Sequence, residues 1–186
     1  MPTSIPKKVS PLGKFLRAFV LFALLTIVGY GIWTGLEHRA GDGPRIGVLA
    51  PDFSLKNQAG QTVKLSSFQG KPVLLNFWAT WCGPCQSEMP SLEALYQKYK
   101  DKNFVVLGVS LDEDGWPAIQ EFLKQVPVTF PILNDNGETI SELYHTFRIP
   151  ESYLIDASGK ISDKIVGPQD YTQPIFSEKI ERLIGN

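Results

Sequence analysis

The chain has 186 residues, of which 43% are hydrophobic and 20% charged, and its formal net charge is -1. This is the composition of a globular domain with enough apolar residues for a core. The charge pattern shows no basic excess, which excludes a typical nucleic-acid binder. It also shows no acidic block, which excludes a disordered acidic tail. The length fits one globular domain with an N-terminal appendage.

The first predicted element is an apolar helix at residues 18–36, a run of 19 residues without a charge. A helix of this length spans about 30 Å, which matches the hydrocarbon core of a membrane. Basic residues lie mainly before it, at Lys7, Lys8, Lys14 and Arg17. We therefore expect residues 1–17 in the cytoplasm, a signal anchor at 18–36, a linker at 37–49 and an exported domain at 50–186. A cleaved signal peptide is the alternative, although its apolar region is normally shorter.

The exported part alternates strand-like and helix-like patterns. Residues 52–55 and 63–65 predict a hairpin, and 73–78 predict a central strand buried on both faces. The later elements, in chain order, are a helix after the cysteines with a kink at Pro90, a buried strand at 104–111, a helix at 116–126, a short strand or extended segment at 128–133, a short helix at 139–147, a hairpin of 153–155 with 161–166, and a C-terminal helix up to residue 184. This alternation predicts a mixed α/β sheet with helices on both faces.

The two cysteines of the chain stand three residues apart, at Cys82 and Cys85, where the central strand gives way to a helix. A thiol at a helix N-terminus meets free backbone N–H groups and the positive end of the helix dipole, which favour the thiolate. The spacing places both sulfurs on one helix face, close enough for a disulfide. We expect Cys82 to be the exposed attacking thiol and Cys85 the buried resolving thiol, with Pro84 fixing the first turn.

Two alternatives to redox chemistry are weaker. A static disulfide more often closes a long loop, because short loops gain less chain entropy. A metal site needs three or four ligands, and the two histidines, His38 and His145, are the remaining soft candidates. His38 adjoins the apolar segment and His145 belongs to a separate helical pattern, so thiol–disulfide exchange is the favoured interpretation.

Residues 75–85, Leu-Asn-Phe-Trp-Ala-Thr-Trp-Cys-Gly-Pro-Cys, resemble the active site of a thioredoxin-fold protein. Residues 86–92, 50–55 and 149–156 extend the similarity to the membrane-anchored TlpA/ResA/CcmG group of thiol–disulfide oxidoreductases. The resemblance covers residues 50 to about 184. It implies a thioredoxin-like α/β fold with a mixed central sheet, helices on both faces, an N-terminal β-hairpin extension and an inserted βα element.

The resemblance also implies roles for several side chains. Pro150 matches the family's cis-proline, which lies beside the dithiol and helps to hold extended substrate. Glu88 matches a glutamate that shapes thiol acidity, and its place three residues after Cys85 allows the two side chains to meet; a solvated helix carboxylate is the alternative. Glu151 is a candidate for partner recognition, with an exposed loop carboxylate as its alternative. Trp81, Gly83, Pro84 and Ile149 complete the expected support and substrate-binding set.

Asn76 stands where thioredoxin has a buried aspartate. An amide can neither take up nor release a proton, so Glu88 becomes the leading candidate for proton transfer to and from Cys85. Asn76 itself is expected to support the site, and its simplest interpretation is a core amide that bonds its neighbours.

These observations predict an extracytoplasmic thiol–disulfide oxidoreductase on a bacterial cytoplasmic membrane that reduces disulfides in exported proteins. The resemblance suggests apocytochrome c as one client and a membrane thiol reductase as the electron donor. No bound cofactor is required, because the sulfurs carry the electrons. Net oxidation of exported thiols is the alternative direction, and a metal-binding chaperone that uses both cysteines and a histidine is the alternative class.

Overall fold

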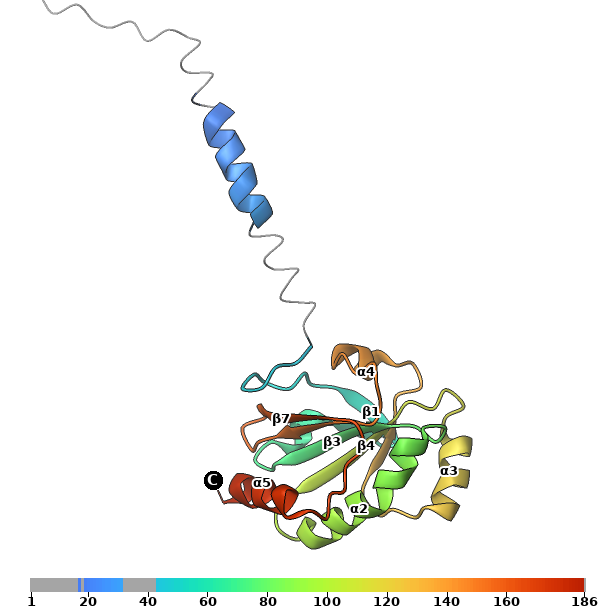
Figure 1. Cartoon of the computed structure of the whole chain (residues 1–186). Helices are drawn as coiled ribbons and strands as arrows, with labels where there is room; N and C mark the ends of the chain where they lie inside the picture. The colour runs from blue at the N-terminus through green and yellow to red at the C-terminus, as the bar shows by residue number, and fades with distance from the viewer. Residues whose placement is uncertain (1–16, 18, 32–42, 186) are drawn as a thin grey trace, which may run out of the picture. The chain divides into compact units, whose positions relative to one another are not determined.

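The structure is a computed structural model that describes residues 17, 19–31 and 43–185 (Figure 1). The chain divides into two units, Met1–Asp42 and Gly43–Asn186. In the first unit, residues 19–31 are helical, and the rest of the expected span at 18–36 lies outside the described residues. Within the described ranges, no helix is both long enough and apolar enough to cross a membrane.

The second unit is built around one mixed sheet of seven strands in the order β2-β1-β5-β4-β3-β6-β7. The strands are β1 Ser54–Asn57, β2 Thr62–Lys64, β3 Val73–Trp78, β4 Val105–Ser110, β5 Ile132–Asn134, β6 Glu151–Ile155 and β7 Ile161–Val166. β3 runs parallel to β4 and antiparallel to β6. The helices are η1 Leu65–Phe68, α2 Gly83–Tyr99, α3 Trp116–Gln125, α4 Thr139–Leu143 and α5 Pro174–Ile184. This arrangement is the thioredoxin-like fold that the sequence predicted.

The two faces of β3 separate the core into two layers. Leu74 and Trp78 pack with residues of α2, α3 and α5 on one face. Leu75 and Phe77 pack on the other face with α4 and η1. Because side chains alternate along a strand, Asn76 falls on the same face as Leu74 and Trp78, which is the face that α2 covers.

Both predicted hairpins are confirmed, because β1 pairs antiparallel with β2 and β6 pairs antiparallel with β7. We identify the β5–α4 segment with the expected inserted βα element, since β5 enters the sheet between β1 and β4 and α4 follows it in the chain. Residues 43–49, expected as linker, belong to the second unit, and the Gly47 N–H donates to the Ile161 carbonyl at 2.7 Å.

The clearest differences from the predicted boundaries are at β5 and α4. β5 begins at Ile132 because Pro131, which has no N–H, cannot donate to a ladder. α4 ends at Leu143, and His145 follows in a left-handed conformation with φ 52°, so the helix cannot continue to residue 147. α2 runs from Gly83 to Tyr99 as one helix that contains Pro90.

Candidate active site

The dithiol caps the N-terminus of α2. β3 ends at Trp78, the chain turns, and Cys82 becomes the N-cap residue of the helix. Cys82 and Cys85 form a disulfide with their Cα atoms 5.2 Å apart, and the Cys85 N–H lies 3.2 Å from the Cys82 sulfur. A thiolate at Cys82 would therefore receive a backbone hydrogen bond and the positive end of a 17-residue helix. Pro84 occupies the first turn, where its missing N–H costs nothing.

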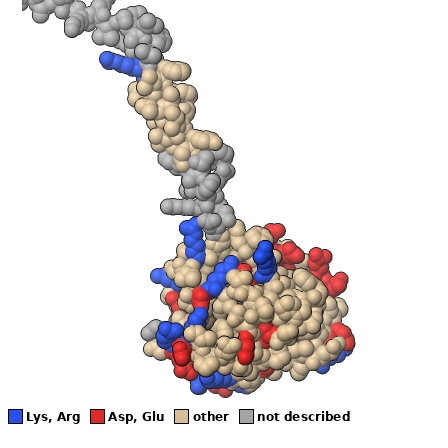
Figure 2. Space-filling model, viewed as in Figure 1, with Lys and Arg blue, Asp and Glu red and all other residues tan. Residues whose placement is uncertain are grey.

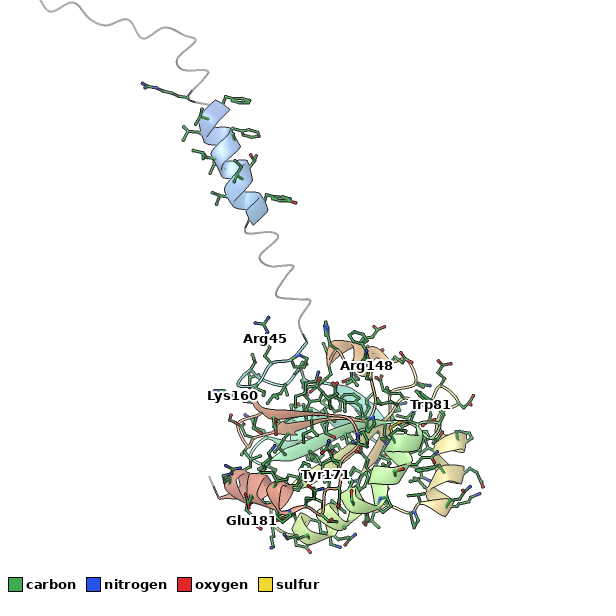
Figure 3. The ribbon with its side chains drawn as sticks, in the orientation of Figure 1. Arg45, Trp81, Arg148, Lys160, Tyr171 and Glu181 are labelled. Carbon is green, nitrogen blue, oxygen red and sulfur yellow. A yellow bond between two sulfur atoms is a disulfide. The ribbon has the colours of Figure 1, made fainter. Side chains whose placement is uncertain are left out.

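The two sulfurs differ in exposure, but by less than the sequence suggested. Cys85 is fully buried, as predicted, whereas Cys82 is only 7% exposed in the disulfide form. The expectation of an openly exposed Cys82 is thus wrong for this state. The exposed group is Trp81, at 68%, which Figure 3 places at the edge of the domain where α2 begins. Cys82 is the more accessible sulfur of a pair that is nearly covered.

The covering group is the loop before β6. The Ile149 carbonyl oxygen lies 3.7 Å from the Cys82 sulfur, and the Ile149–Pro150 peptide bond is cis. The cis-proline predicted beside the dithiol is therefore confirmed in its geometry. A disulfide sulfur has no proton to donate, so this approach is a contact; a Cys82 thiol could donate to the carbonyl, and a thiolate would be repelled by it. The loop opposes part of the helix-dipole effect.

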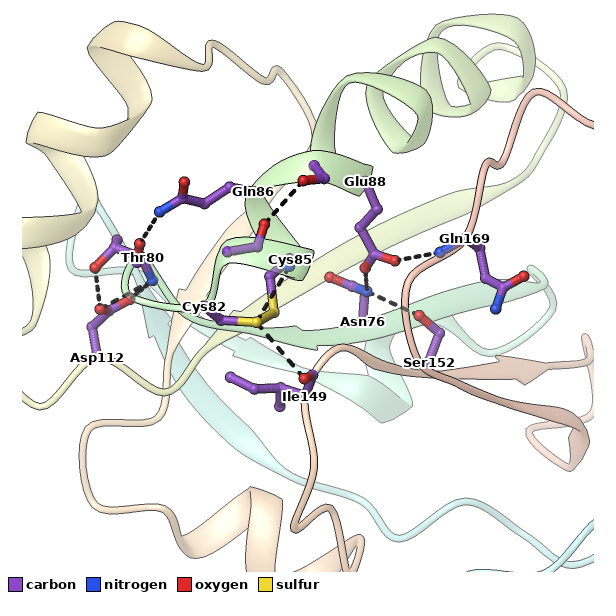
Figure 4. The surroundings of a disulfide bond; sticks show 12 residues. Asn76, Thr80, Cys82, Cys85, Gln86, Glu88, Asp112, Ile149, Ser152 and Gln169 are labelled. Carbon is purple, nitrogen blue, oxygen red and sulfur yellow. Dashed lines mark hydrogen bonds between the residues drawn. A yellow bond between two sulfur atoms is a disulfide. The ribbon is translucent and has the colours of Figure 1, made fainter.

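Glu88 lies beneath the dithiol, one helical turn beyond Cys85 (Figure 4). Its side chain is 2% exposed, so the alternative of a solvated carboxylate is wrong. One carboxylate oxygen accepts from the Asn76 amide at 2.8 Å and the other from the Gln169 N–H at 3.0 Å. Burial raises the pKa of Glu88 to about 7, and the Gln169 and Asn76 donors oppose that rise. A carboxyl group with this pKa can hold or release a proton near neutral pH.

Asn76 connects Glu88 to a pair of hydroxyl groups. Its amide nitrogen also donates to the Ser152 hydroxyl at 2.9 Å, and that oxygen lies 2.8 Å from the Tyr171 hydroxyl. Burial and the nearby Glu88 charge both raise the pKa of Tyr171, which keeps the phenol neutral. Asn76 is the buried, hydrogen-bonded amide that the sequence predicted. Ser152, Gln169 and Tyr171 were not predicted, because each reaches the site from a distant part of the chain.

A second polar cluster holds the turn before Cys82. The Gln86 side chain donates to the Thr80 carbonyl at 2.5 Å. Thr80 in turn donates to Asp112, a buried carboxylate just after β4 that also accepts from the Ser110 hydroxyl at 2.7 Å. This cluster fixes the path of the chain into the dithiol.

Glu151 is placed differently from the expectation. It is the first residue of β6 and 5% exposed, so it is neither an exposed loop carboxylate nor a free group for a partner. One of its oxygens accepts from Thr146 at 2.8 Å and Tyr153 at 2.7 Å, and pairs with Lys164 at 3.0 Å. The carboxylate therefore ties the loop that carries Ile149 to the sheet.

The remaining predicted positions are less constrained. A Cβ atom added at Gly83 would meet nothing within 4 Å, so no neighbouring group requires glycine there. In the described part of the chain, no group of three or more His, Cys, Asp or Glu residues is arranged to hold a metal ion. Of the two histidines, His145 packs edge-on against Phe147, with ring centroids 5.8 Å apart, and His38 lies outside the described residues.

A disulfide at the start of a helix on a thioredoxin-like sheet, with a buried second sulfur, defines a thiol–disulfide oxidoreductase. The chain belongs to the AhpC/TSA family, whose pattern matches residues 46–164. It is 37% identical over 157 residues to the thiol–disulfide oxidoreductase ResA of Bacillus thuringiensis subsp. konkukian (strain 97-27), a match covering 84% of this chain and 90% of that protein.

Solved structures agree with this placement. A crystal structure from Chlorobium tepidum, assigned as the thiol:disulfide interchange protein DsbE, superposes with a TM-score of 0.71 and 37% identity over 76% of this chain and 99% of that one. The crystal structure of StoA from Bacillus subtilis gives a TM-score of 0.59 and 28% identity over 68% of this chain and 94% of that one. The protein is thus a thioredoxin-fold thiol–disulfide oxidoreductase similar to ResA and DsbE.

Proposed function

We propose that the protein reduces disulfides in exported proteins, with Cys82 as the attacking thiol, Cys85 as the resolving thiol and Glu88 as the group that exchanges a proton with Cys85. The observation that carries this proposal is the asymmetry of the dithiol. Cys82 caps the helix and is the more accessible sulfur, whereas Cys85 is fully buried one turn from a buried carboxylate.

The reaction begins when the Cys82 thiolate attacks a client disulfide and forms a mixed disulfide, releasing the first client sulfur. Cys85 then attacks the Cys82 sulfur, the Cys82–Cys85 bond forms, and the second client sulfur leaves. Two electrons pass from the dithiol to the client. The protein is left in the disulfide state that the structure shows.

In this proposal the protein recognises its clients through apolar and backbone contacts near Cys82, more than through a surface of one charge. Trp81 adjoins Cys82 and exposes 68% of its surface, and the Ile149 carbonyl oxygen lies 3.7 Å from the Cys82 sulfur. Acidic and basic side chains are mixed on the face seen in Figure 2, and the net charge is -1. An extended client segment with apolar residues beside its cysteine fits such a surface.

The proposed location is the extracytoplasmic side of a bacterial cytoplasmic membrane, with residues 18–36 as the anchor. The charge asymmetry around that segment and the similarity to ResA support it. The exported side has no reducing glutathione pool, so a membrane thiol reductase would have to return electrons to the dithiol. A reporter fused after Asn186 is expected to be active only outside the cytoplasm; activity inside would contradict the location and leave the redox chemistry untouched.

The direct test is a trap in cells that express the full chain. Cys85→Ser removes the resolving thiol, so Cys82 should accumulate in mixed disulfides that appear on non-reducing gels and disappear with reductant. The matched control is Cys82→Ser combined with Cys85→Ser, which should form none. Adducts that persist in the double variant, or no adduct in the single variant, would contradict the assignment of Cys82.

The identity of the trapped proteins tests the proposed client, and the redox state of the natural protein in cells tests the proposed direction of the reaction. Apocytochrome c, whose haem-attachment site contains a Cys-x-x-Cys-His pair, is the first client to examine. A reductase should be found mainly as the dithiol in cells, because its donor keeps it reduced. A wild-type protein found mainly as the disulfide would favour net oxidation of clients instead.

A further inference from the structure

The Asn76 side-chain amide is hydrogen-bonded at its nitrogen but not at its oxygen. Its nitrogen donates to Glu88 and Ser152, whereas its Oδ1 oxygen is buried without a hydrogen-bond partner. A buried acceptor without a donor costs about 1–3 kcal/mol. Among the described residues, only one other side-chain atom, the Trp78 indole nitrogen, shares this condition. Most buried polar side-chain atoms in proteins have a hydrogen-bond partner, so the bare Asn76 oxygen is an exception.

The unused oxygen lies on the side of the disulfide. Figure 4 shows the nitrogen end of Asn76 turned toward Glu88 and Ser152 and its oxygen end turned toward the cysteines. In the disulfide state neither sulfur carries a proton, so the oxygen has nothing to accept there. Reduction places a proton on the buried Cys85, which has no route to bulk water through its own surface, being 0% exposed. The orphaned acceptor is therefore a property of the oxidised state.

The nitrogen end of the Asn76 amide matches only one protonation state of Glu88. The observed hydrogen bonds suit a charged Glu88, because both of its oxygens accept from N–H donors. A protonated Glu88 must donate its O–H, and an amide nitrogen cannot accept it. Rotation of the Asn76 amide by half a turn exchanges its two ends, so that the oxygen faces Glu88 and the nitrogen faces Cys85.

The neighbouring hydroxyl groups can follow this rotation. Ser152 now accepts from the Asn76 nitrogen, and in its bond with Tyr171 either hydroxyl can be the donor. After rotation Ser152 can donate to the Asn76 oxygen and accept from Tyr171. Every member of the chain Asn76–Ser152–Tyr171 then keeps a partner in both orientations. An ordinary side-chain carboxylate at position 76 could not alternate in this way.

We propose that the Asn76 amide is a two-position relay between Cys85 and Glu88, its oxygen facing Cys85 when Cys85 is a thiol and its nitrogen facing Cys85 when Cys85 is a thiolate. The proposal rests on the role of Cys85 as the resolving thiol and deepens it. In the first position Asn76 accepts from the Cys85 S–H and donates to the Glu88 carboxylate. In the second it donates to the Cys85 thiolate and accepts from the Glu88 acid. Cys85 and Glu88 together hold one proton and one negative charge in both positions.

The step balances in atoms and electrons. The Cys85 S–H bond breaks and a Glu88 O–H bond forms because the proton passes from the sulfur to the carboxylate. The Asn76 amide keeps both of its N–H protons throughout and turns to pair with the new thiolate and the new acid. The Cys85 thiolate then attacks the Cys82 sulfur of the mixed disulfide, the Cys82–Cys85 bond forms, and the Cys82–client bond breaks. The client sulfur leaves with the electron pair and takes the proton from Glu88, and the amide returns to the orientation seen in the disulfide structure.

Among the groups that face Glu88, Cys85 is the one that can exchange a proton with it. Cys85 lies on the same helix, the Gln169 backbone and the Tyr171 hydroxyl come from the segment after β7, and Asn76 and Ser152 come from β3 and β6. Tyr171 stays neutral because burial raises its pKa. Among the described residues, no Lys, Arg or His forms an ion pair with the Glu88 carboxylate. The proton that balances the charge of Glu88 must then come from Cys85 or from water.

Nuclear magnetic resonance of the full chain tests the relay without any substitution. We would label asparagine side-chain nitrogens, glutamate carboxyl carbons and cysteine β-carbons, and titrate the reduced protein. The Asn76 amide signals should move with the same midpoint as the Glu88 carboxyl and Cys85 signals. Asn76 signals that stay fixed while Glu88 and Cys85 titrate would overturn the proposal.

A variant separates the two chemical steps. Asn76→Leu keeps a side chain of similar size but removes both ends of the relay. Resolution of a mixed disulfide on Cys82 should slow by at least about tenfold, whereas the attack of Cys82 on a peptide disulfide should keep its rate. Equal slowing of both steps, or no slowing of resolution, would count against the relay. If Asn76→Leu does not fold, the titration of the natural protein decides alone, and the Cys85→Ser trap reports separately on the proposed function.

Discussion

Asp112 accepts two hydrogen bonds from Thr80: its carboxylate lies 3.0 Å from the Thr80 backbone nitrogen and 2.5 Å from the Thr80 hydroxyl. Asp112 is 2% exposed and follows directly after β4, and Thr80 lies two residues before Cys82. Because β3 and β4 are neighbours in the sheet, this contact fixes the turn that delivers Cys82 to the helix N-terminus. The alignment of the attacking sulfur with the helix dipole therefore depends on a carboxylate outside the Cys-Gly-Pro-Cys motif.

Asp112→Asn should loosen this turn. The amide keeps one acceptor oxygen and loses the charge that strengthens both bonds, so we expect a loss of about 1–3 kcal/mol in unfolding free energy. Alkylation of Cys82 in the reduced protein should also slow at neutral pH, because a less ordered turn weakens the helix-terminus stabilisation of the thiolate. Urea unfolding and alkylation followed by mass spectrometry measure the two effects. The exposed Asp114→Asn is the matched control, and equal effects of both substitutions would refute the role of Asp112.

Glu88→Gln should change the redox properties of the dithiol. The substitution removes a buried negative charge next to Cys85 while keeping the side-chain size. A thiolate then forms more easily, the reduced form is stabilised, and the reduction potential rises. Release of product should slow because the proton relay is lost. Equilibration with a glutathione buffer gives the potential, and a potential and exchange rate equal to those of the natural protein would show that Glu88 has no part in the chemistry.

The same carboxyl group should make stability depend on pH. Burial raises the pKa of Glu88 from an ordinary 4.5 to about 7 in the folded protein. Between pH 4.5 and about 7, Glu88 is therefore protonated in the folded state and ionised in the unfolded state. This contribution is fully present below pH 4.5 and is lost as the pH rises through 7. Relative to Glu88→Gln, the oxidised natural protein should lose up to about 3 kcal/mol across that window. Two unfolding curves that run parallel from pH 4.5 to 8 would be incompatible with the raised pKa.

Two glycines should respond in opposite ways to alanine. At Gly108 in β4, an added Cβ would lie 2.8 Å from Ile132 Cδ1, 3.0 Å from Phe130 Cε2 and 3.2 Å from Trp78 Nε1. We expect Gly108→Ala to cost about 1–3 kcal/mol through overpacking. Gly83→Ala should be neutral or slightly stabilising, because nothing lies within 4 Å and the residue begins a helix. Thermal unfolding of both variants decides this, and a destabilising Gly83→Ala would reveal a constraint on the motif that its surroundings do not show.

The sequence allowed the fold and the centre of the site to be predicted because their signals are local. The apolar run at 73–78 marks a doubly buried strand, Gly83 and Pro84 mark the start of a helix, and the spacing from Cys85 to Glu88 is one helical turn. Each signal depends on residues only a few positions apart. The structure adds the burial of Glu88, which spacing could suggest but not establish.

The parts that were missed depend on contacts between distant segments. Gln169 and Ser152 approach Glu88 and Asn76 only after the sheet has formed. Asp112 opens an Asp-Glu-Asp stretch that reads as a solvated acidic turn until its contact with Thr80 is known. Glu151 was expected at the surface because it follows a proline in a loop, yet the start of β6 turns it inward toward Lys164 and Tyr153.

The reactivity of the two sulfurs in the reduced full chain tests the central claim most directly. A sub-stoichiometric alkylating agent at neutral pH, followed by mass spectrometry of the peptides, gives the rate at each cysteine. The helix N-terminus favours the Cys82 thiolate, and Cys85 is fully buried, so we predict that Cys82 reacts much faster than Cys85. Equal rates, or a faster Cys85, would contradict the assignment of Cys82 as the attacking thiol.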